Sequence, residues 1–291
     1  MFAILGIVLV FGAIVGGFLM EHGKLLVLMQ PAELVIIGGA AIGTLLVGNP
    51  LPLVIRIFKS VLGILSGSPF TKDYYLETLK MLNDIFQYAR KSGMAKLEED
   101  VEDPEKSALF SKYPKLIKDH HLLYFICDTL RTAVAGVVPA HDLDAMIEND
   151  IEVHYHETSA PVQALATVAD ALPGLGIVAA VLGVVITMGA LGGPPEEIGH
   201  KVAAALVGTF LGILLSYGVV GPIAGNLAKI NDAEVQYYQS LRAGLMAFAK
   251  GMAPIIAVEF ARRAIPHEHR PTFRDMETAC KGGAAPVAKA A

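Results

Sequence analysis

The chain has 291 residues, a mean hydropathy of +0.53 and a formal net charge of −5, and only 18% of its residues are charged. Soluble domains carry about 25% charged residues, and here the apolar residues stand in blocks, which argues against a soluble globular protein. The small net charge and the lack of a basic stripe argue against a nucleic-acid-binding protein.

Four runs lack Asp, Glu, Lys and Arg and are long enough to cross about 30 Å of bilayer hydrocarbon as helices. They are Phe2–Met20, Leu34–Ile55, Ala171–Pro195 and Val202–Ala228. Because Pro50 and Pro52 fall in the second run, its helix is predicted to end near Val47. The first run has neither a basic segment before it nor a small-residue cleavage site after it, so we expect a retained helix rather than a signal peptide.

The distribution of Lys and Arg predicts the orientation of the spans. Of the 23 Lys and Arg residues, only Lys24 and Lys201 lie in the short loops that join spans one and two and spans three and four. The other 21 lie between spans two and three or after span four. Since positive residues stay on the cytoplasmic side, we expect both termini and the large loop in the cytoplasm.

The large loop has roughly 115 residues, too many for a structureless connection in a compact protein. Apolar residues recur at three- and four-residue spacing in Tyr75–Ala89, Leu122–Val137 and Leu143–Val153, which predicts three helices. Strand alternation is absent, and we expect a helical bundle completed by Ile230–Arg263. The predicted fold class is all-α, with four transmembrane helices and a large cytoplasmic helical domain.

The pattern also predicts four domains along the chain. They are a transmembrane hairpin (1–54), a cytoplasmic helical domain (55–170), spans three and four (171–228) and a cytoplasmic tail (229–291). Ile55–Leu65 is amphipathic, with Arg56 and Lys59 on its polar face, and is expected along the inner membrane surface. Gly282–Ala291 is rich in Gly, Ala and Pro and is expected to be disordered.

The spans are rich in glycines at four-residue spacing, which lets membrane helices approach closely. The pairs are Gly12/Gly16, Gly39/Gly43, Gly189/Gly193, Gly208/Gly212 and Gly221/Gly225. Four helices offer limited surface for so much close packing, so we infer an oligomer. None of the spans has a carboxylate, lysine or histidine in its middle, so an ion path through this protein would need a titrating group from a partner.

Hydroxyl groups and prolines are the polar features of spans three and four. The hydroxyls belong to Thr187, Thr209, Ser216 and Tyr217. They either face an ion path or bond to their own helix backbone four residues back. Pro173 and Pro222 each remove a backbone donor, so each is a candidate hinge or a packing kink, and Pro173 alternatively begins a helix.

Residue patterns of catalysis and metal binding are missing. The pairs His120-His121, His154/His156 and His267/His269 lack the spacing or the Cys partners of metal sites and are interpreted as surface or interfacial residues. Cys127 and Cys280 are interpreted as small buried hydrophobes. Walker, dinucleotide and nucleophile-elbow motifs are absent. We expect no enzyme activity, no cofactor and no metal.

Four stretches of the chain resemble the MotA family of flagellar stator subunits. They are PAELVIIGGA from Pro31, LPGLGIVAAVLGVV from Leu172, VGTFLGILLSYG from Val207 and PIIAVEFAR from Pro254. The likeness runs from Met1 to about Thr278. The resemblance implies an inner-membrane ring of five copies around two copies of MotB, which would supply the ion-binding aspartate and anchor the ring to peptidoglycan. Ion flow would turn the ring, which would push on the rotor protein FliG.

The same resemblance assigns roles to individual residues. Arg90 and Glu98 match the family's torque residues, although without the resemblance they would be an ordinary solvated face. Exposed complementary charges suit fast, reversible contacts. Pro173 and Pro222 match the hinge prolines, and Thr209 matches a polar residue near the ion path.

The residue type at position 180 bears on which ion is used, because sodium-driven relatives have a threonine where this chain has Ala180. Alanine lacks the hydroxyl oxygen that a dehydrated hard cation needs, so we predict protons. Thr187 departs from some proton-type members, which have histidine at that position, and Tyr217 is placed with Ala180, Thr187 and Thr209 along the path.

Two other functions stay open from the sequence. An ExbB/TolQ-like subunit also forms an ion-driven ring, but it has three spans and lacks the hairpin start at Pro31. A non-conducting membrane scaffold would not need the paired prolines and hydroxyls. A membrane enzyme is disfavoured because ionisable residues do not cluster in the spans.

Overall fold

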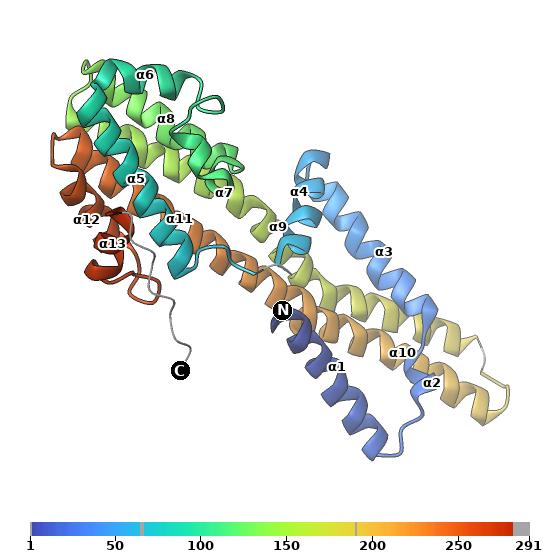
Figure 1. Ribbon diagram of the computed structural model, residues 1–291. Helices are drawn as coiled ribbons and strands as arrows, with labels where there is room; N and C mark the ends of the chain where they lie inside the picture. The colour runs from blue at the N-terminus through green and yellow to red at the C-terminus, as the bar shows by residue number, and fades with distance from the viewer. Residues whose placement is uncertain (1, 65–66, 190, 282–291) are drawn as a thin grey trace. The chain divides into compact units, whose positions relative to one another are not determined.

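The computed structural model describes residues 2–64, 67–189 and 191–281, and these are helical, with no strand among them, which confirms the predicted all-α class. The predicted disordered end, Gly282–Ala291, lies outside the described residues. The chain forms two compact units (Figure 1). The membrane unit comprises Met1–Gly67 and Glu157–Asn231, and the helical unit comprises Ser68–His156 and Asp232–Ala291.

The membrane unit contains the predicted spans. Its helices are α1 (Phe2–Met20), α2 (Leu25–Leu28), α3 (Pro31–Gly48), α4 (Leu51–Gly63), the end of α9 (Ala140–Met188), α10 (Pro195–Leu215), a π-helical turn (Ser216–Val220) and the start of α11 (Gly221–Ala249). Within the described residues, four helical stretches are long and apolar enough to cross a membrane, which confirms the predicted number. They are Phe2–Met20, Leu25–Gly48, Ala140–Met188 and Pro195–Ala249.

Prolines mark the starts of several helices. Pro31, Pro52, Pro195 and Pro254 lie in the first turns of α3, α4, α10 and α12 (Pro254–Ala264). A first-turn N–H has no partner inside its helix, so proline costs nothing there, and its fixed φ favours the helix. The second span ends at Gly48, one residue beyond the predicted Val47.

Helix α9 corrects two predictions made from the sequence. It runs unbroken from Ala140 to Met188, so Leu143–Val153 is not a separate short helix and Pro173 does not begin one. Pro161 also lies inside α9 and leaves the carbonyl of Glu157 without its usual helical donor. The guanidinium of Arg56 in α4 donates to that carbonyl at 3.3 Å. A side chain distant in sequence thus satisfies a group that the proline leaves free.

Helices α9 and α10 touch through backbone, because glycines lie where they meet. A Cβ atom added to Gly212 would lie 2.6 Å from the carbonyl oxygen of Leu172, and one added to Gly176 would lie 2.8 Å from that of Gly208. The predicted pair Gly208/Gly212 therefore does allow close approach. By contrast, Gly12, Gly16, Gly39 and Gly43 have open space where a Cβ would be, as far as this chain is concerned.

The helical unit is built around α5. Its elements are α5 (Lys72–Ser92), α6 (Met94–Glu102), a 3-10 turn (Phe110–Lys112), α7 (Pro114–Ile117), α8 (His120–Ala135), the start of α9, the rest of α11, α12 and α13 (Phe273–Cys280). Helix α5 contacts α6, α12 and α13, and α6 contacts α8. The periodicity of Tyr75–Ala89 and Leu122–Val137 correctly predicted α5 and α8.

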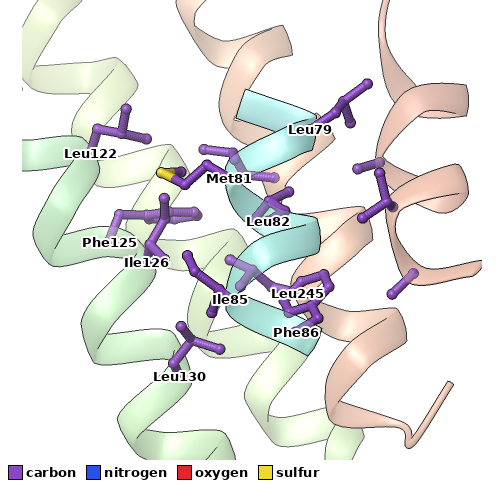
Figure 2. Close-up of a cluster of buried hydrophobic side chains, with 14 of the residues drawn as sticks. Leu79, Met81, Leu82, Ile85, Phe86, Leu122, Phe125, Ile126, Leu130 and Leu245 are labelled. Atoms are coloured by element: carbon purple, nitrogen blue, oxygen red, sulfur yellow. The ribbon is translucent and has the colours of Figure 1, made fainter. Parts of the chain in front are cut away.

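The core of the helical unit lies between α5, α8 and α11. Figure 2 shows apolar side chains of α5 lying between those of α8 and Leu245 of α11. Leu82, Ile85 and Phe86 are fully buried there, and Phe86 stacks on Phe248 at a ring-centroid distance of 4.3 Å. Burial of each such side chain contributes about 1.5–3 kcal/mol, so this core holds the unit together.

Candidate functional site

The contact between α9 and α10 brings two predicted ion-path residues into one place. A Cβ atom added to Gly208 would lie 3.1 Å from Cβ of Ala179 and 3.2 Å from the backbone nitrogen of Ala180. Thr209 follows Gly208 directly, and both Ala180 and Thr209 are half-buried. The backbone of α9 at Ala180 therefore lies against α10 at Gly208, the residue before Thr209.

The two threonines of these helices differ in their hydrogen bonding. Thr187 is buried, and its Oγ1 donates to the carbonyl of Gly183 at 2.8 Å. Bonding to its own helix backbone is the alternative that the sequence left open for it. The hydroxyl of Thr209 makes no such bond within the described chain, which leaves it available to water or an ion.

Tyr217 lies elsewhere in the membrane unit. It sits in the π-helical turn, is 72% exposed and borders a groove together with Pro222 and residues Ala3 and Val10 of α1. The structure does not bring it to Ala180 and Thr209. The π-helical turn ends at Val220, two residues before Pro222, so the backbone is irregular close to this proline, whereas α9 continues through Pro173. Such turns occur frequently at functional sites.

The membrane unit also buries a carboxylate that the sequence patterns did not predict as a site. Glu33 lies in the first turn of α3, before the predicted start of the span at Leu34, and the structure buries it to 6% exposure. Its Oε2 has no hydrogen-bond partner in the described chain and lies 2.7 Å from where a Cβ on Gly208 would be. Glu33 is at the start of its own span and not in its middle, as expected, but the fold brings its carboxyl group to Gly208 of α10.

The sequence did contain a signal for Glu33. The residues that α3 buries are Glu33, Ile37, Ala41 and Leu45, which recur every four positions. Residues at that spacing share one helix face. The carboxyl group is thus the first member of the stripe that packs on α9 and α10, a position visible only when the helix is started at Pro31.

Arg90 and Glu98 lie on a corner of the helical unit. Arg90 is in the last turn of α5 and Glu98 is in α6, and the two helices meet at Gly93, whose φ of +89° favours glycine. Both charged side chains are exposed, and neither forms an ion pair or hydrogen bond with another described residue. Leu97, fully buried, fixes α6 against the core. The two charges thus face outward from a firmly packed support.

Comparisons with known proteins decide the family. A family model described as motility protein A N-terminal matches residues 4–93, and one described as the MotA/TolQ/ExbB proton channel family matches residues 118–240. Over 277 residues the chain is 40% identical to motility protein A of Escherichia coli strain K12 and 39% identical to that of Salmonella typhimurium, covering 95% of this chain and 94% of each relative. The chain belongs to the MotA family.

Membership of the MotA family makes this chain a membrane-embedded stator subunit of the flagellar motor. The match to the N-terminal model covers the first two spans, which favours MotA over the ExbB/TolQ-like alternative. The fold agrees with two solved MotAB structures. That from Bacillus subtilis has a TM-score of 0.70 at 23% identity, covering 88% of this chain and 92% of that one. That from C. jejuni has a TM-score of 0.74 at 17% identity, covering 91% and 96%.

This MotA-family chain also has a polar cluster in its helical unit. The rings of His121 and His154 stack with a centroid distance of 3.8 Å. The hydroxyl oxygen of Tyr238 lies 2.8 Å from Nδ1 of His121, and Oε1 of Glu234 lies 3.0 Å from Nε2 of His154. Burial first, and then the neighbouring His154, lowers the pKa of His121. Over the part of the chain that the structure describes, no group of three His, Cys, Asp or Glu residues could hold a metal ion.

Proposed function

We propose that this chain is the ring-forming subunit of a proton-driven flagellar stator. It acts with MotB to couple proton flow across the inner membrane to torque on the rotor. The observation that supports this most is the match to motility protein A along 95% of the chain, through all four spans and the helical unit. The two similar solved structures are MotAB complexes, which supports MotB as the partner.

The proton path runs beside Ala180 and Thr209. The methyl group of Ala180 offers no oxygen to a dehydrated cation, whereas a proton needs only a titratable group and ordered water or hydroxyls. Thr209 supplies a hydroxyl that forms no hydrogen bond with another described residue. In this proposal the aspartate of MotB accepts the proton, and five copies of this chain surround two MotB chains. Thr187 lies further along α9 from Ala180, and Tyr217, in the exposed π-helical turn, lies apart from this part of the path.

Pro173 and Pro222 couple the proton to movement. Pro173 follows Leu172, whose carbonyl lies at the closest approach of α9 to Gly212 of α10. Pro222 follows the π-helical turn. Both positions combine a missing backbone donor with helix contact, so small local changes there alter the course of α9 or α11. Arg90 and Glu98 then act on FliG as steering charges on an exposed corner.

The rotation of tethered flagella tests the proposed function. The chain is expressed with its cognate MotB in a host without stators, and external sodium and the proton motive force are varied separately. We expect speed to follow the proton motive force and to ignore sodium. Speed that requires sodium would refute the argument from Ala180 while leaving a stator.

Pro173→Ala separates a motor from a non-conducting scaffold. We expect rotation to stop while the amount of complex recovered from membranes stays unchanged. Normal rotation of the Pro173→Ala variant would refute the hinge. Absence of rotation by the unmodified protein, despite an assembled complex, would favour the scaffold.

A further inference from the structure

Glu33 is an acid that neither the ion path nor the rotor contact described above uses. Its side chain is 6% exposed, and Oε2 lacks a hydrogen-bond partner among the described residues. Buried polar groups are nearly always paired, so an unpaired carboxyl oxygen in a native fold requires an explanation. Ionisable residues inside membrane segments are rare and mark ion paths or proton relays.

The surroundings of Glu33 are free of other titratable groups. The rest of α3, the apolar part of α9 from Ala171 and that of α10 from Val202 contain none. The flanking charges are Lys24, at the start of α2, and Lys201, which pairs with Glu197 at 2.9 Å. No ion pair joins Glu33 to any described residue. No described residue near Glu33 can therefore neutralise its carboxylate by pairing with it, whereas a bound proton can.

Two independent estimates put Glu33 within the apolar layer. Gly208 lies about 9 Å along α10 from Val202, where the apolar run of that helix begins, at about 1.5 Å per residue. Ala179 lies about 13 Å along α9 from its end at Met188 by the same measure. Since Oε2 of Glu33 and Cβ of Ala179 both lie against the position of a Cβ on Gly208, at 2.7 and 3.1 Å, the carboxyl group lies roughly 10 Å inside the apolar part of the two helices.

We propose that Glu33 is a proton-binding site of this chain, situated where α3 meets α9 and α10. The inference rests on the proposed proton-driven function and adds to it a site that this chain itself supplies. Oε2 accepts a proton from hydronium at the outer side: one O–H bond of the hydronium breaks, water is released, and an O–H bond forms that neutralises the carboxylate. The O–H bond breaks again when the proton returns to water or passes to the carboxylate of the partner. The backbone nitrogen of Ala180 lies at the same contact, and Thr209 follows Gly208 in α10.

Glu33→Gln tests the need for an exchangeable proton, because glutamine keeps the size of the side chain but does not titrate. We expect rotation speed to fall by about 100-fold, as removal of a proton-transfer group does, with the amount of complex unchanged. Glu33→Asp keeps the acid and is expected to rotate faster than Glu33→Gln. Glu21→Gln is the matched control, since Glu21 is an exposed carboxylate after α1, and should rotate like the unmodified protein.

Infrared spectroscopy of the purified complex tests the site without rotation. A protonated carboxyl has its own C=O stretching band, and we expect one that disappears in Glu33→Gln, shifts in Glu33→Asp and titrates with pH. A band that never titrates would make Glu33 a fixed hydrogen-bond donor and overturn the proposal. Equal slowing in Glu33→Gln and Glu33→Asp, or normal speed in Glu33→Gln, would also overturn it.

The proposed function can fail separately. If the unmodified protein and the Glu21→Gln control both follow sodium instead of the proton motive force, the ion assignment is wrong. The infrared titration then still decides whether Glu33 binds a proton.

Discussion

Arg90 and Glu98 show how a residue can be charged, exposed and still held in a defined position. Gly93, at φ +89°, makes the corner between their helices, and the buried Leu97 and Ala89 fix both sides of it. Neither charge has a partner in the described chain. An exposed charge without a partner contributes little to stability, so its substitution changes contacts with another molecule more than it changes the fold.

Charge reversal at the corner is therefore expected to reduce motility without loss of protein. Arg90→Glu and Glu98→Lys should each reduce swarming several-fold, because under the proposed function like charges would replace complementary ones at the rotor. The amount of complex in the membrane should stay normal. Lys112→Glu, at an exposed lysine elsewhere in the helical unit, is the control. If it impairs swarming equally, net charge and not this corner is responsible.

At the scale of elements, the sequence predicted the helices that are defined by the pattern of neighbouring residues. Periodicity predicted α5 and α8, and uninterrupted apolar runs predicted the four spans. The unbroken course of α9 was not predictable, because prolines such as Pro161 and Pro173 usually interrupt a helix. The carbonyl that Pro161 leaves free accepts a hydrogen bond from Arg56, 101 residues away from Glu157. The burial of Glu33 likewise depends on Gly208, which belongs to another helix. Ala180 and Thr209 were identified by resemblance, and the contact of Ala180 with Gly208, the residue before Thr209, is a property of the fold.

Helix α12 is stabilised by ion pairs between a glutamate and two arginines of the same helix. Glu259 is 15% exposed and accepts hydrogen bonds from Arg262 at 2.7 and 2.8 Å and from Arg263 at 2.8 Å. Arg262 also donates to the carbonyl of Pro271 at 3.0 Å, which joins α12 to the segment before α13. The hydrogen bond from Arg262 is the main cause that lowers the pKa of Glu259 below its ordinary value of 4.5.

Because the pKa of Glu259 is lower in the folded than in the unfolded state, its contribution to stability is present above about pH 4.5 and is lost as the pH falls further. We expect Glu259→Gln to destabilise the helical unit by about 1–2 kcal/mol at neutral pH. The difference in thermal midpoint should shrink as the pH falls through 4.5. Glu102→Gln, at an exposed carboxylate, should change neither. A difference that persists unchanged in acid would contradict this assignment.

At the scale of the whole molecule, apolar surface and charge separate along the chain. Helix α1 buries none of its 19 residues, so its whole apolar surface is available to lipid or to other subunits. The helical unit instead encloses its own core and places its charges outside. Of the 23 Lys and Arg residues, 21 lie outside the two short loops of the membrane hairpins. This asymmetry is the basis for the proposed orientation, with both termini in the cytoplasm.

Two native thiols are poorly reactive, which makes labelling of added cysteines a direct test of that orientation. Cys127 is 1% exposed, and burial raises its pKa to about 12. Cys280 is half-buried, and burial raises its pKa to about 11. A thiol reacts as the thiolate, so both should be nearly inert at neutral pH. The unmodified chain therefore gives a low background in intact cells.

Two exposed positions report the two sides of the membrane. We expect Glu197→Cys, at the start of α10, to react with a membrane-impermeant maleimide in intact cells, because the loop before it faces outward. Lys96→Cys, in α6, should react only after the cells are opened. Labelling of Lys96→Cys in intact cells, with Glu197→Cys protected, would reverse the proposed orientation and move the Arg90–Glu98 corner away from a cytoplasmic rotor. The predicted pattern places that corner on the side where the rotor protein is available, as torque transfer requires.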